Sequence, residues 1–261
     1  MSKFELTRMT WREAEDKFKE NPVILIPMGS IEQHGPTTPV GDYRYMTEIC
    51  REVAKRTGAI SVPTIPWGYS EVFKNFPGTI TIRPDTLKAL LIDHIESLVK
   101  FGLDHIMFVC GHKGNLPILE QLAREIKDRY KLRVATIEPI GWFDDAWKKE
   151  VYGTSDVHIG HGSDPMLSLA MELFPEDVRE DLYEEGHKSE WNGHQTQGVA
   201  NFYSNDDIWH MYLDYDDIAP NGVIGDAKHA SAEVGKRTVE RMINISSRIV
   251  KDFAKIDTRI S

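Results

Sequence analysis

The sequence predicts an α/β protein in which helices cover both faces of a mostly parallel sheet. Short apolar segments with the length of buried strands alternate with longer segments whose apolar residues recur at helical spacing. This alternation is typical of parallel sheets, since each helix carries the chain back to the start of the next strand. The strands are expected at residues 23–28, 59–65, 79–82, 105–110 and 132–137.

The expected helices lie before, between and after these strands, and several have recognisable ends. Thr10 and Glu13 have the spacing of a capping box, so the first helix starts there, and Pro22 blocks its continuation. Gly58 is suited to end the second helix. The expected ranges are residues 11–20, 43–56, 83–101, 116–130, 165–173 and 231–256.

Size and composition are those of an ordinary globular protein. The 261 residues suffice for a large core, and the 41% hydrophobic and 28% charged fractions are usual. A formal net charge of -10 argues against nucleic acid or an anionic membrane as a partner. Cys50 and Cys110 lie in apolar contexts, which favours buried thiols over a disulfide. Without an apolar signal region or a membrane-length segment, we expect a cytoplasmic protein.

A long polar loop follows the first expected strand and carries the strongest candidates for metal binding. Residues 29–42 are rich in glycine and proline, which predicts an irregular conformation. Glu32, His34 and Asp42 lie in this loop, and carboxylates and imidazoles are common ligands of divalent metals. The alternative is a polar surface loop with scattered charges.

His112 is a further candidate, because it lies between glycines directly after the strand at residues 105–110. Open α/β sheets bind their ligands beyond the C-terminal ends of the strands. We therefore expect His112 to converge with the loop at residues 29–42. A lone histidine in such a turn is otherwise more often structural than catalytic.

A third polar segment, residues 156–165, precedes an expected helix and offers His158, His161 and Asp164. Pro165 is suited to the first position of that helix. Asp164 is equally suited to cap the helix, and this role is compatible with metal binding.

Two further segments are candidates for the walls of a pocket. Residues 67–79 form an aromatic-rich loop, which is either a pocket wall or a packed surface loop. Residues 176–221 are long for a plain loop, so we interpret them as an insertion that closes the pocket or makes an oligomer contact. The candidates for substrate binding are Lys113, Trp67, Tyr69, Trp191 and His194.

Together these motifs resemble the creatininase (creatinine amidohydrolase) family over about residues 8–245. The matching motifs occur in the family's order, at residues 29–36 with Asp42, 76–79, 111–115, 161–164 and 222–226. The resemblance implies a three-layer α/β/α sandwich in a single domain over residues 1–261. It also implies a hydrolase with two divalent metal ions, acting as a homo-oligomer, often a hexamer.

The resemblance further implies a set of metal ligands. The family's ligands correspond to Glu32, His34, Asp42 and His112, with Asp42 as the bridging carboxylate. Some members carry a glutamate where this chain has Gly114, and others carry an acid three residues after the later histidine. We therefore assign Asp164 as the remaining ligand. Mixed nitrogen and oxygen ligands suit Zn, Mn or Fe.

Departures from the family pattern lie around the expected substrate. Thr37 replaces a histidine, Val72 and Phe73 replace a Glu-His pair, and Gly160 replaces a glutamate of creatininase proper. Creatinine is therefore not the expected substrate. The segment 160–165 looks closer to members that open the ring of an oxidised inositol, 3-dehydro-scyllo-inosose, in inositol catabolism. The alternatives are an amidohydrolase for a cyclic amide or formamide, and a non-catalytic metal- or sugar-binding protein.

The chemistry implied by the resemblance is attack of metal-activated water on a carbonyl carbon. His161 is the expected general acid/base, and orientation of a ligand carboxylate is its alternative role. His158 is a second catalytic candidate.

Overall fold

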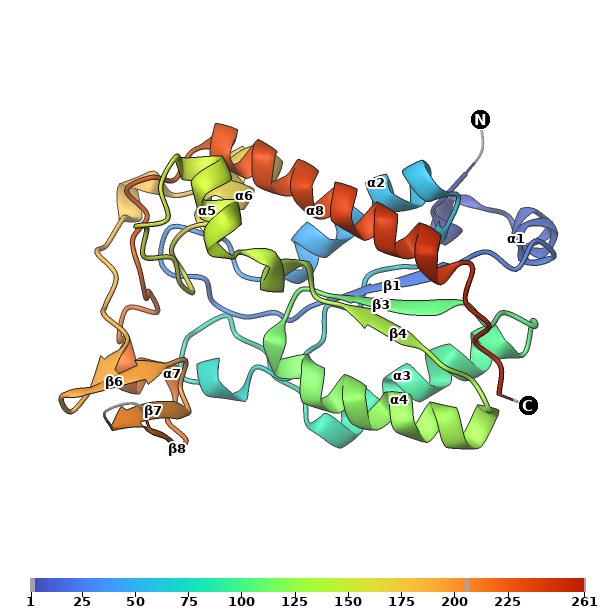
Figure 1. Ribbon diagram of the computed structural model, residues 1–261, viewed down its shortest axis with the longest axis horizontal. Coiled ribbons are helices and arrows are strands. Elements are labelled where there is room, and N and C mark those ends of the chain that lie inside the picture. The colour runs from blue at the N-terminus through green and yellow to red at the C-terminus, as the bar shows by residue number, and fades with distance from the viewer. Residues whose placement is uncertain (1–2, 205–206, 261) are drawn as a thin grey trace.

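The computed structural model describes residues 3–204 and 207–260 and shows a parallel sheet between layers of helices (Figure 1). Within these residues, four strands form the parallel sheet in the order β2-β1-β3-β4. The central strands β1 (Ile24–Met28) and β3 (Ile106–Cys110) are completely buried, while β2 (Ile60–Ser61) and β4 (Ala135–Ile137) lie at the edges. Burial on both faces explains why the central strands are continuously apolar.

Helices cover both faces of the sheet, as predicted. One face is covered by α2 (Tyr43–Thr57), α6 (Met166–Leu173) and α8 (Ala232–Phe253). The other face is covered by α3 (Pro84–Val99) and α4 (Leu116–Tyr130). Successive strand residues point to opposite faces, so Leu25 packs with the first set of helices and Ile24 and Ile26 with the second.

The helix ends follow the signals in the sequence. In α1 (Trp11–Phe18), Thr10 and Glu13 form the expected capping box. α2 ends at Gly58, whose φ of 82° suits glycine. α8 begins after Ser231, whose hydroxyl accepts a hydrogen bond from the Val234 amide.

Several predicted boundaries are wrong. Residues 59–65 contain only the short strand β2, since Pro63 has no amide hydrogen to donate to a longer ladder. At residues 79–82, Ile80 and Thr81 form isolated bridges rather than a strand. Residues 132–137 contain only β4, because Leu132 pairs with Arg259 instead. The helix expected from residue 165 begins at Met166.

Some short elements were not predicted. These are α5 (Asp145–Tyr152), α7 (Tyr215–Ile218) and the 3-10 turns Leu6–Arg8, Glu71–Phe73, Lys113–Asn115, Pro139–Trp142, Pro175–Asp177 and Glu180–Leu182. Cys50 and Cys110 are buried free thiols, as expected. No helix among the described residues combines the length and the apolar character that a membrane span requires.

The expected insertion at residues 176–221 contains a second, antiparallel sheet. Its strands are β5 (Glu190–Trp191), β6 (His194–Gln197), β7 (Asn201–Ser204) and β8 (Asp207–His210). This sheet lies beside α7 at one end of the molecule (Figure 1). Trp191 packs in an apolar cluster with Phe73 and Tyr215, so the insertion rests on the loop at residues 67–79.

The contact between α6 and α8 yields the first prediction. A Cβ added at Gly235 of α8 would lie 2.0 Å from the Ser168 carbonyl oxygen of α6. Alanine favours a helix over glycine by about 1 kcal/mol, but overpacking against backbone costs about 1–3 kcal/mol. We expect Gly235→Ala to lower the free energy of unfolding, measured by urea denaturation. The exposed neighbour Lys236→Ala is the control, and a Gly235→Ala protein as stable as that control contradicts the close packing.

Candidate metal centre

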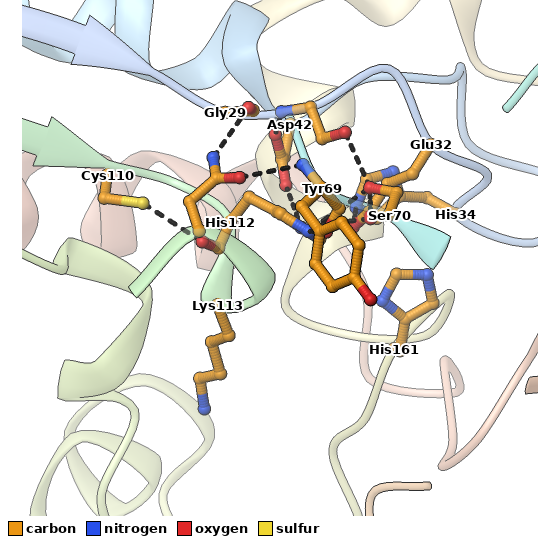
Figure 2. Close-up of polar contacts among 12 residues, drawn as sticks. Gly29, Glu32, His34, Asp42, Tyr69, Ser70, Cys110, His112, Lys113 and His161 are labelled. Carbon is orange, nitrogen blue, oxygen red and sulfur yellow. Dashed lines mark hydrogen bonds and ion pairs between the residues drawn. The ribbon is translucent and has the colours of Figure 1, made fainter. Parts of the chain in front are cut away.

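The C-terminal edge of the parallel sheet carries a cluster of carboxylates and histidines (Figure 2). Glu32 and His34 lie in the loop after β1, and Asp42 is the last residue before α2. His112 follows β3, and the segment before α6 brings His161 to the same place. Since β1 and β3 are neighbouring parallel strands, the loops that follow them meet at one edge.

Glu32, Asp42 and His112 form the first of two groups of described residues that could hold a metal ion. His112 Nδ1 lies 3.0 Å from Glu32 Oε2 and 3.3 Å from Asp42 Oδ2. The three residues are buried, with exposures of 2%, 2% and 5%. Two carboxylates and an imidazole this close together are a compact set of donors for a divalent cation.

Buried hydrogen bonds hold the two carboxylates in place. The Ser30 amide donates to Asp42 Oδ1 at 2.6 Å. The Ser70 hydroxyl lies 2.7 Å from Glu32 Oε2 and 2.6 Å from Ser30 Oγ. Gly29 permits this close approach, because a Cβ there would lie 2.1 Å from Asp42 Oδ1. The oxygens that would bind a cation therefore have fixed positions.

Backbone groups fix the orientation of His112. Its Nε2 lies 2.8 Å from the Tyr69 carbonyl oxygen and donates to it, so Nδ1 faces the carboxylates. Asn115 holds the Tyr69 segment by accepting from the Tyr69 amide and donating to the Gly29 carbonyl. Outer hydrogen bonds of this kind orient metal-binding histidines.

Gly114 is a position where this arrangement excludes any side chain. A Cβ there would lie 2.3 Å from the Tyr69 carbonyl oxygen and 2.4 Å from His112 Nε2. The hydrogen bond between Tyr69 and His112 therefore occupies the space that a longer residue would need. A glutamate at this position is incompatible with the observed geometry.

Glu32, His34 and His161 form the second group of potential ligands. His34 Nε2 lies 3.6 Å from Glu32 Oε1, and the His34 and His161 rings stack with their centroids 4.7 Å apart. Phe73 stacks on His161 at 4.3 Å. His161 Nε2 donates to the Gln33 carbonyl at 2.7 Å. Glu32 is thus the residue common to both groups, and the bridging role expected of Asp42 stays a prediction.

The protonation of the cluster indicates a place for positive charge. Burial together with the charge of Glu32 raises the pKa of Asp42. Burial would also raise the pKa of Glu32, but the positive charge of protonated His112 outweighs it and lowers that pKa. Burial disfavours protonated His112, yet Glu32 and Asp42 raise its pKa well above the usual value. A proton on His112 Nδ1 therefore stands where a cation would bind.

The second group has neutral histidines. Burial, together with the charge of His161, lowers the pKa of His34 to about 3. Burial also lowers the pKa of His161. His34 Nδ1 is buried and has no hydrogen-bond partner among the described residues. Buried carboxylate charge is costly unless it is compensated, and neutral imidazole nitrogens beside Glu32 can bind a metal ion, so the residues of both groups fit divalent cations.

Asp164 and His158 are not brought into either group. Asp164 is fully buried, but its Oδ2 accepts a hydrogen bond from Tyr152 at 2.5 Å and its Oδ1 accepts one from the Ser168 amide at 3.0 Å. It thus supports the start of α6, which is the alternative role foreseen for it. His158 is exposed, and its carbonyl accepts from the Asp226 amide.

The candidates for substrate binding lie at different distances from the cluster. Tyr69 is half-buried beside His112, and its ring extends toward the side of His161 in Figure 2. Lys113 points away from the cluster and lies 3.9 Å from Glu138 Oε1. Trp67 is exposed at the surface. Trp191 and His194 are paired in the antiparallel sheet, where Trp191 is half-buried and His194 is exposed.

Sequence reasoning missed residues that support the cluster without binding a metal themselves. Ser70 and Asn115 are fully buried and position Glu32 and the Tyr69 carbonyl. Phe73, which stacks on His161, differs from the family pattern, and the sequence did not indicate this contact. Ser70 is one of several polar residues in the loop at residues 67–79, so no signal in the sequence singled it out.

Comparison with known proteins identifies the family to which this chain belongs. The model of the family described as creatininase, creatinine amidohydrolase, matches residues 7–250. The chain belongs to the creatininase family. Relatives of this creatininase-family protein include the mycofactocin precursor peptide peptidase of Mycobacterium ulcerans, 29% identical, with 85% of this chain and 82% of the relative covered. The 3-dehydro-scyllo-inosose hydrolase of Thermotoga maritima is 26% identical, with coverage of 94% and 82%.

Solved structures confirm the predicted fold. A crystal structure of creatinine amidohydrolase aligns with a TM-score of 0.80 and 22% identity, covering 98% of this chain and 100% of the other. A mutant creatininase of Zn-Zn type aligns with a TM-score of 0.79 and 23% identity, covering 97% and 99%. A manganese form aligns with a TM-score of 0.76 and 24% identity, covering 97% and 99%. The three-layer creatininase fold is therefore shared.

Glu32→Gln tests the cluster as a metal centre. The substitution keeps the shape of the side chain but removes the charge common to both groups. We expect affinity for Zn²⁺ or Mn²⁺ to fall by more than the roughly 10- to 100-fold typical of losing an outer hydrogen bond, measured by equilibrium dialysis with elemental analysis. Glu71→Gln, in an exposed ion pair with Lys74, is the control. Equal metal content in both variants contradicts the assignment.

Gly114→Ala tests the support of His112. The added methyl group must displace the Tyr69 carbonyl or the imidazole, so metal affinity should fall by about 10- to 100-fold. Gly141→Ala is the matched control, since the nearest atoms to a Cβ there belong to the flexible side chain of Glu138. A Gly114→Ala protein that binds metal like this control shows that the Tyr69–His112 hydrogen bond does not matter for binding.

Proposed function

We propose that this protein is a divalent-metal hydrolase that attacks a carbonyl carbon of a small polar cyclic substrate. The observation that carries the proposal is the buried group of Glu32, Asp42 and His112 with its oriented Nδ1. When bound, divalent ions lower the pKa of a coordinated water and polarise a carbonyl oxygen. We propose two such ions, of Zn, Mn or Fe, held by the two groups that share Glu32.

The residues of the chain prepare this chemistry before any ion arrives. Ser30, Ser70 and the Tyr69 carbonyl fix the ligand atoms, so little reorganisation accompanies binding. A cation held here would take the place of the proton on His112 Nδ1, so metal affinity should rise with pH. Phe73 and Tyr215 pack against His161 and provide an apolar wall on that side of the centre.

We propose 3-dehydro-scyllo-inosose as the substrate. The 3-dehydro-scyllo-inosose hydrolase of Thermotoga maritima aligns with 94% of this chain, compared with 65% for the creatinine amidohydrolase of Pseudomonas putida. Gly160 replaces a glutamate of creatininase proper, and Phe73, which stacks on His161, replaces a histidine common in the family. In the proposed reaction, water adds to a ring carbonyl, the adjacent ring carbon–carbon bond breaks, and the departing carbon takes up a proton. The product is an open-chain acid.

Hydrolysis of a carbon–nitrogen bond is the second candidate. Two relatives that are each 29% identical are named as acting on such bonds: the Mycobacterium ulcerans peptidase and the Pseudomonas putida creatinine amidohydrolase. The first steps of both reactions are the same, since water adds to a carbonyl carbon in each. The two candidates differ in the group that leaves and takes up the proton.

A substrate panel decides between these candidates. The protein loaded with Zn²⁺, Mn²⁺ or Fe²⁺ would be incubated with 3-dehydro-scyllo-inosose, creatinine, a cyclic amide, a formamide and a short peptide. We expect the inosose alone to gain the mass of one water, detected by mass spectrometry. Glu32→Gln, loaded in the same way, is the control for metal-independent hydrolysis and should show only background.

The outcomes separate the parts of the proposal. Turnover of the amide or peptide, but not of the inosose, overturns the substrate and retains the metal hydrolase. Full metal binding without turnover of any compound in the panel supports the alternative of a metal- or sugar-binding protein. Equal turnover by Glu32→Gln overturns the metal hydrolase itself.

A further inference from the structure

We propose that α2 and α8 form a binding site for a small molecule that carries a phosphate group. The two helices pack on the same face of the parallel sheet (Figure 1). A pocket of about 430 Å³ is lined by Arg56, near the C-terminal end of α2, and by residues between Asn244 and Lys255 on α8 and the turn that follows it. This volume is in the range of sites for small molecules.

The pocket is separate from the candidate metal centre. Asp42 directly precedes α2, and Arg56 lies in the last turn of this helix, roughly 20 Å further along its axis. The inference therefore goes beyond the proposed hydrolase and does not rest on it.

Positive charge gathers around the pocket, although the chain has a formal net charge of -10. The acidic residue Asp252 lines it together with four basic residues, Arg56, Arg248, Lys251 and Lys255. The spacing of Arg248, Lys251 and Lys255 places them on one face of the helical segment, and like charges at this spacing repel one another. A bound anion would relieve this repulsion.

Two of these basic side chains are not neutralised by the protein itself. At the pocket, Lys255 lies 3.0 Å from Asp252 Oδ1 and Arg56 lies 2.9 Å from Glu240 Oε2. These pairs leave Arg248 and Lys251 without an acidic partner among residues 3–204 and 207–260. Both cations are therefore available to bind an anion in the pocket.

Arg56 adds donors whose position is fixed. Its guanidinium donates to both carboxylate oxygens of Glu240 and to Asn244 Oδ1, each at 2.9 Å. A guanidinium has five N–H groups in a rigid plane, so these three bonds leave donors for a further acceptor. Arginine held in this way is well suited to a phosphate group, whose oxygens match the planar fork.

Ser247 distinguishes the pocket from a solvated row of charges. The residue lines the pocket but is only 7% exposed, and its hydroxyl has no hydrogen-bond partner among the described residues. Buried hydroxyls are usually paired, and a serine within a helix often bonds back to a carbonyl of the preceding turn. An oxygen of a ligand in the pocket would supply the missing partner.

Basic side chains near the C-terminal end of a helix also stabilise the helix dipole. That role accounts for Lys251 in the last turn of α8. It does not account for the unpaired hydroxyl of Ser247 or for Arg56, which reaches the pocket from another helix.

The donors around the pocket favour phosphate over carboxylate. A phosphate monoester has three acceptor oxygens and a charge of about -1.5 to -2 at neutral pH, whereas a carboxylate has two oxygens and a single charge. A group with more oxygens and more charge can bind guanidinium, ammonium and hydroxyl donors at the same time.

Isothermal titration calorimetry of the purified protein tests the site. The probes are inorganic phosphate, glucose 6-phosphate and glucose, and we expect the two phosphates to bind and glucose not to bind. In Lys251→Gln, both phosphates should bind about 10-fold more weakly, because a charged donor is lost. Lys236→Gln changes the net charge equally at an exposed position of the same helix outside the pocket, and it should bind like the wild type.

Ser247→Ala tests the pocket without changing its charge. We expect phosphate to bind about 2- to 10-fold more weakly, the effect of losing one neutral hydrogen bond. Ser97→Ala, at an exposed position of α3, is the control and should bind like the wild type. Circular dichroism of each variant shows whether folding is preserved. If Ser247→Ala is unfolded, Arg248→Gln replaces it in the same titration.

Phosphate also binds to metal ions, so Glu32→Gln is titrated in parallel. Binding that is kept in Glu32→Gln and weakened in Lys251→Gln supports the pocket. Binding that is lost in Glu32→Gln but unchanged in Lys251→Gln overturns the inference and points to the candidate metal centre. Equal weakening in Lys251→Gln and Lys236→Gln overturns it too, because only net charge then matters.

The two phosphate probes identify the source of the ligand. Tighter binding of glucose 6-phosphate than of inorganic phosphate supports a phosphate ester as the ligand, and the reverse supports the free ion. A wild-type protein that binds neither probe overturns the inference and leaves the basic residues as a solvated helix face. None of these results changes the test of the proposed hydrolase, which depends on turnover by the metal-loaded protein.

Discussion

The burial of two carboxylates beside one another is the constraint on which the rest of the site depends. Removing each charge from water costs several kcal/mol, and Glu32 and Asp42 also repel one another. The fold offsets these costs with donors that cannot move away: the Ser30 amide, the Ser70 hydroxyl and His112. Each donor belongs to a different segment, so the loops must be held rigidly relative to one another.

The topology of the sheet explains why these loops can meet. From β1 the chain proceeds to β2 on one side, and it then crosses to β3 on the other side of β1. The C-terminal ends of β1 and β3 therefore lie at the point where the strand order reverses, which is where open α/β sheets form their crevice. Asn115 connects the two loops by bonding to Gly29 and Tyr69. β1 and β3 pair in parallel along their full length, so the register between the two strands is fixed. The loops that follow the strands therefore start at defined positions relative to one another.

The sequence predicted the parts of this arrangement that depend on local patterns. Local sequence patterns predict the apolar strands, the helix caps and the polar residues beyond the strand ends. These patterns identified Glu32, His34 and His112 as candidate metal ligands. The role of Ser70 was not predictable, because its partners are about forty residues away in either direction. The antiparallel sheet was missed since its strands are short and mostly polar. The Tyr69 carbonyl is a backbone group, so its role could not be predicted from the type of residue at this position.

The arrangement around Gly114 has a consequence for the charge of the centre. A carboxylate at that position would make the set of potential ligands more negative, whereas Gly114 leaves Glu32 and Asp42 as the two carboxylates of the groups that could hold a metal ion. Two divalent cations with two carboxylates retain more positive charge than the same cations with three. A more positive centre polarises an uncharged carbonyl more strongly, and it also attracts the negative charge that develops on the carbonyl oxygen. The lack of a carboxylate at position 114 is therefore compatible with the neutral, oxygen-rich substrate that we propose.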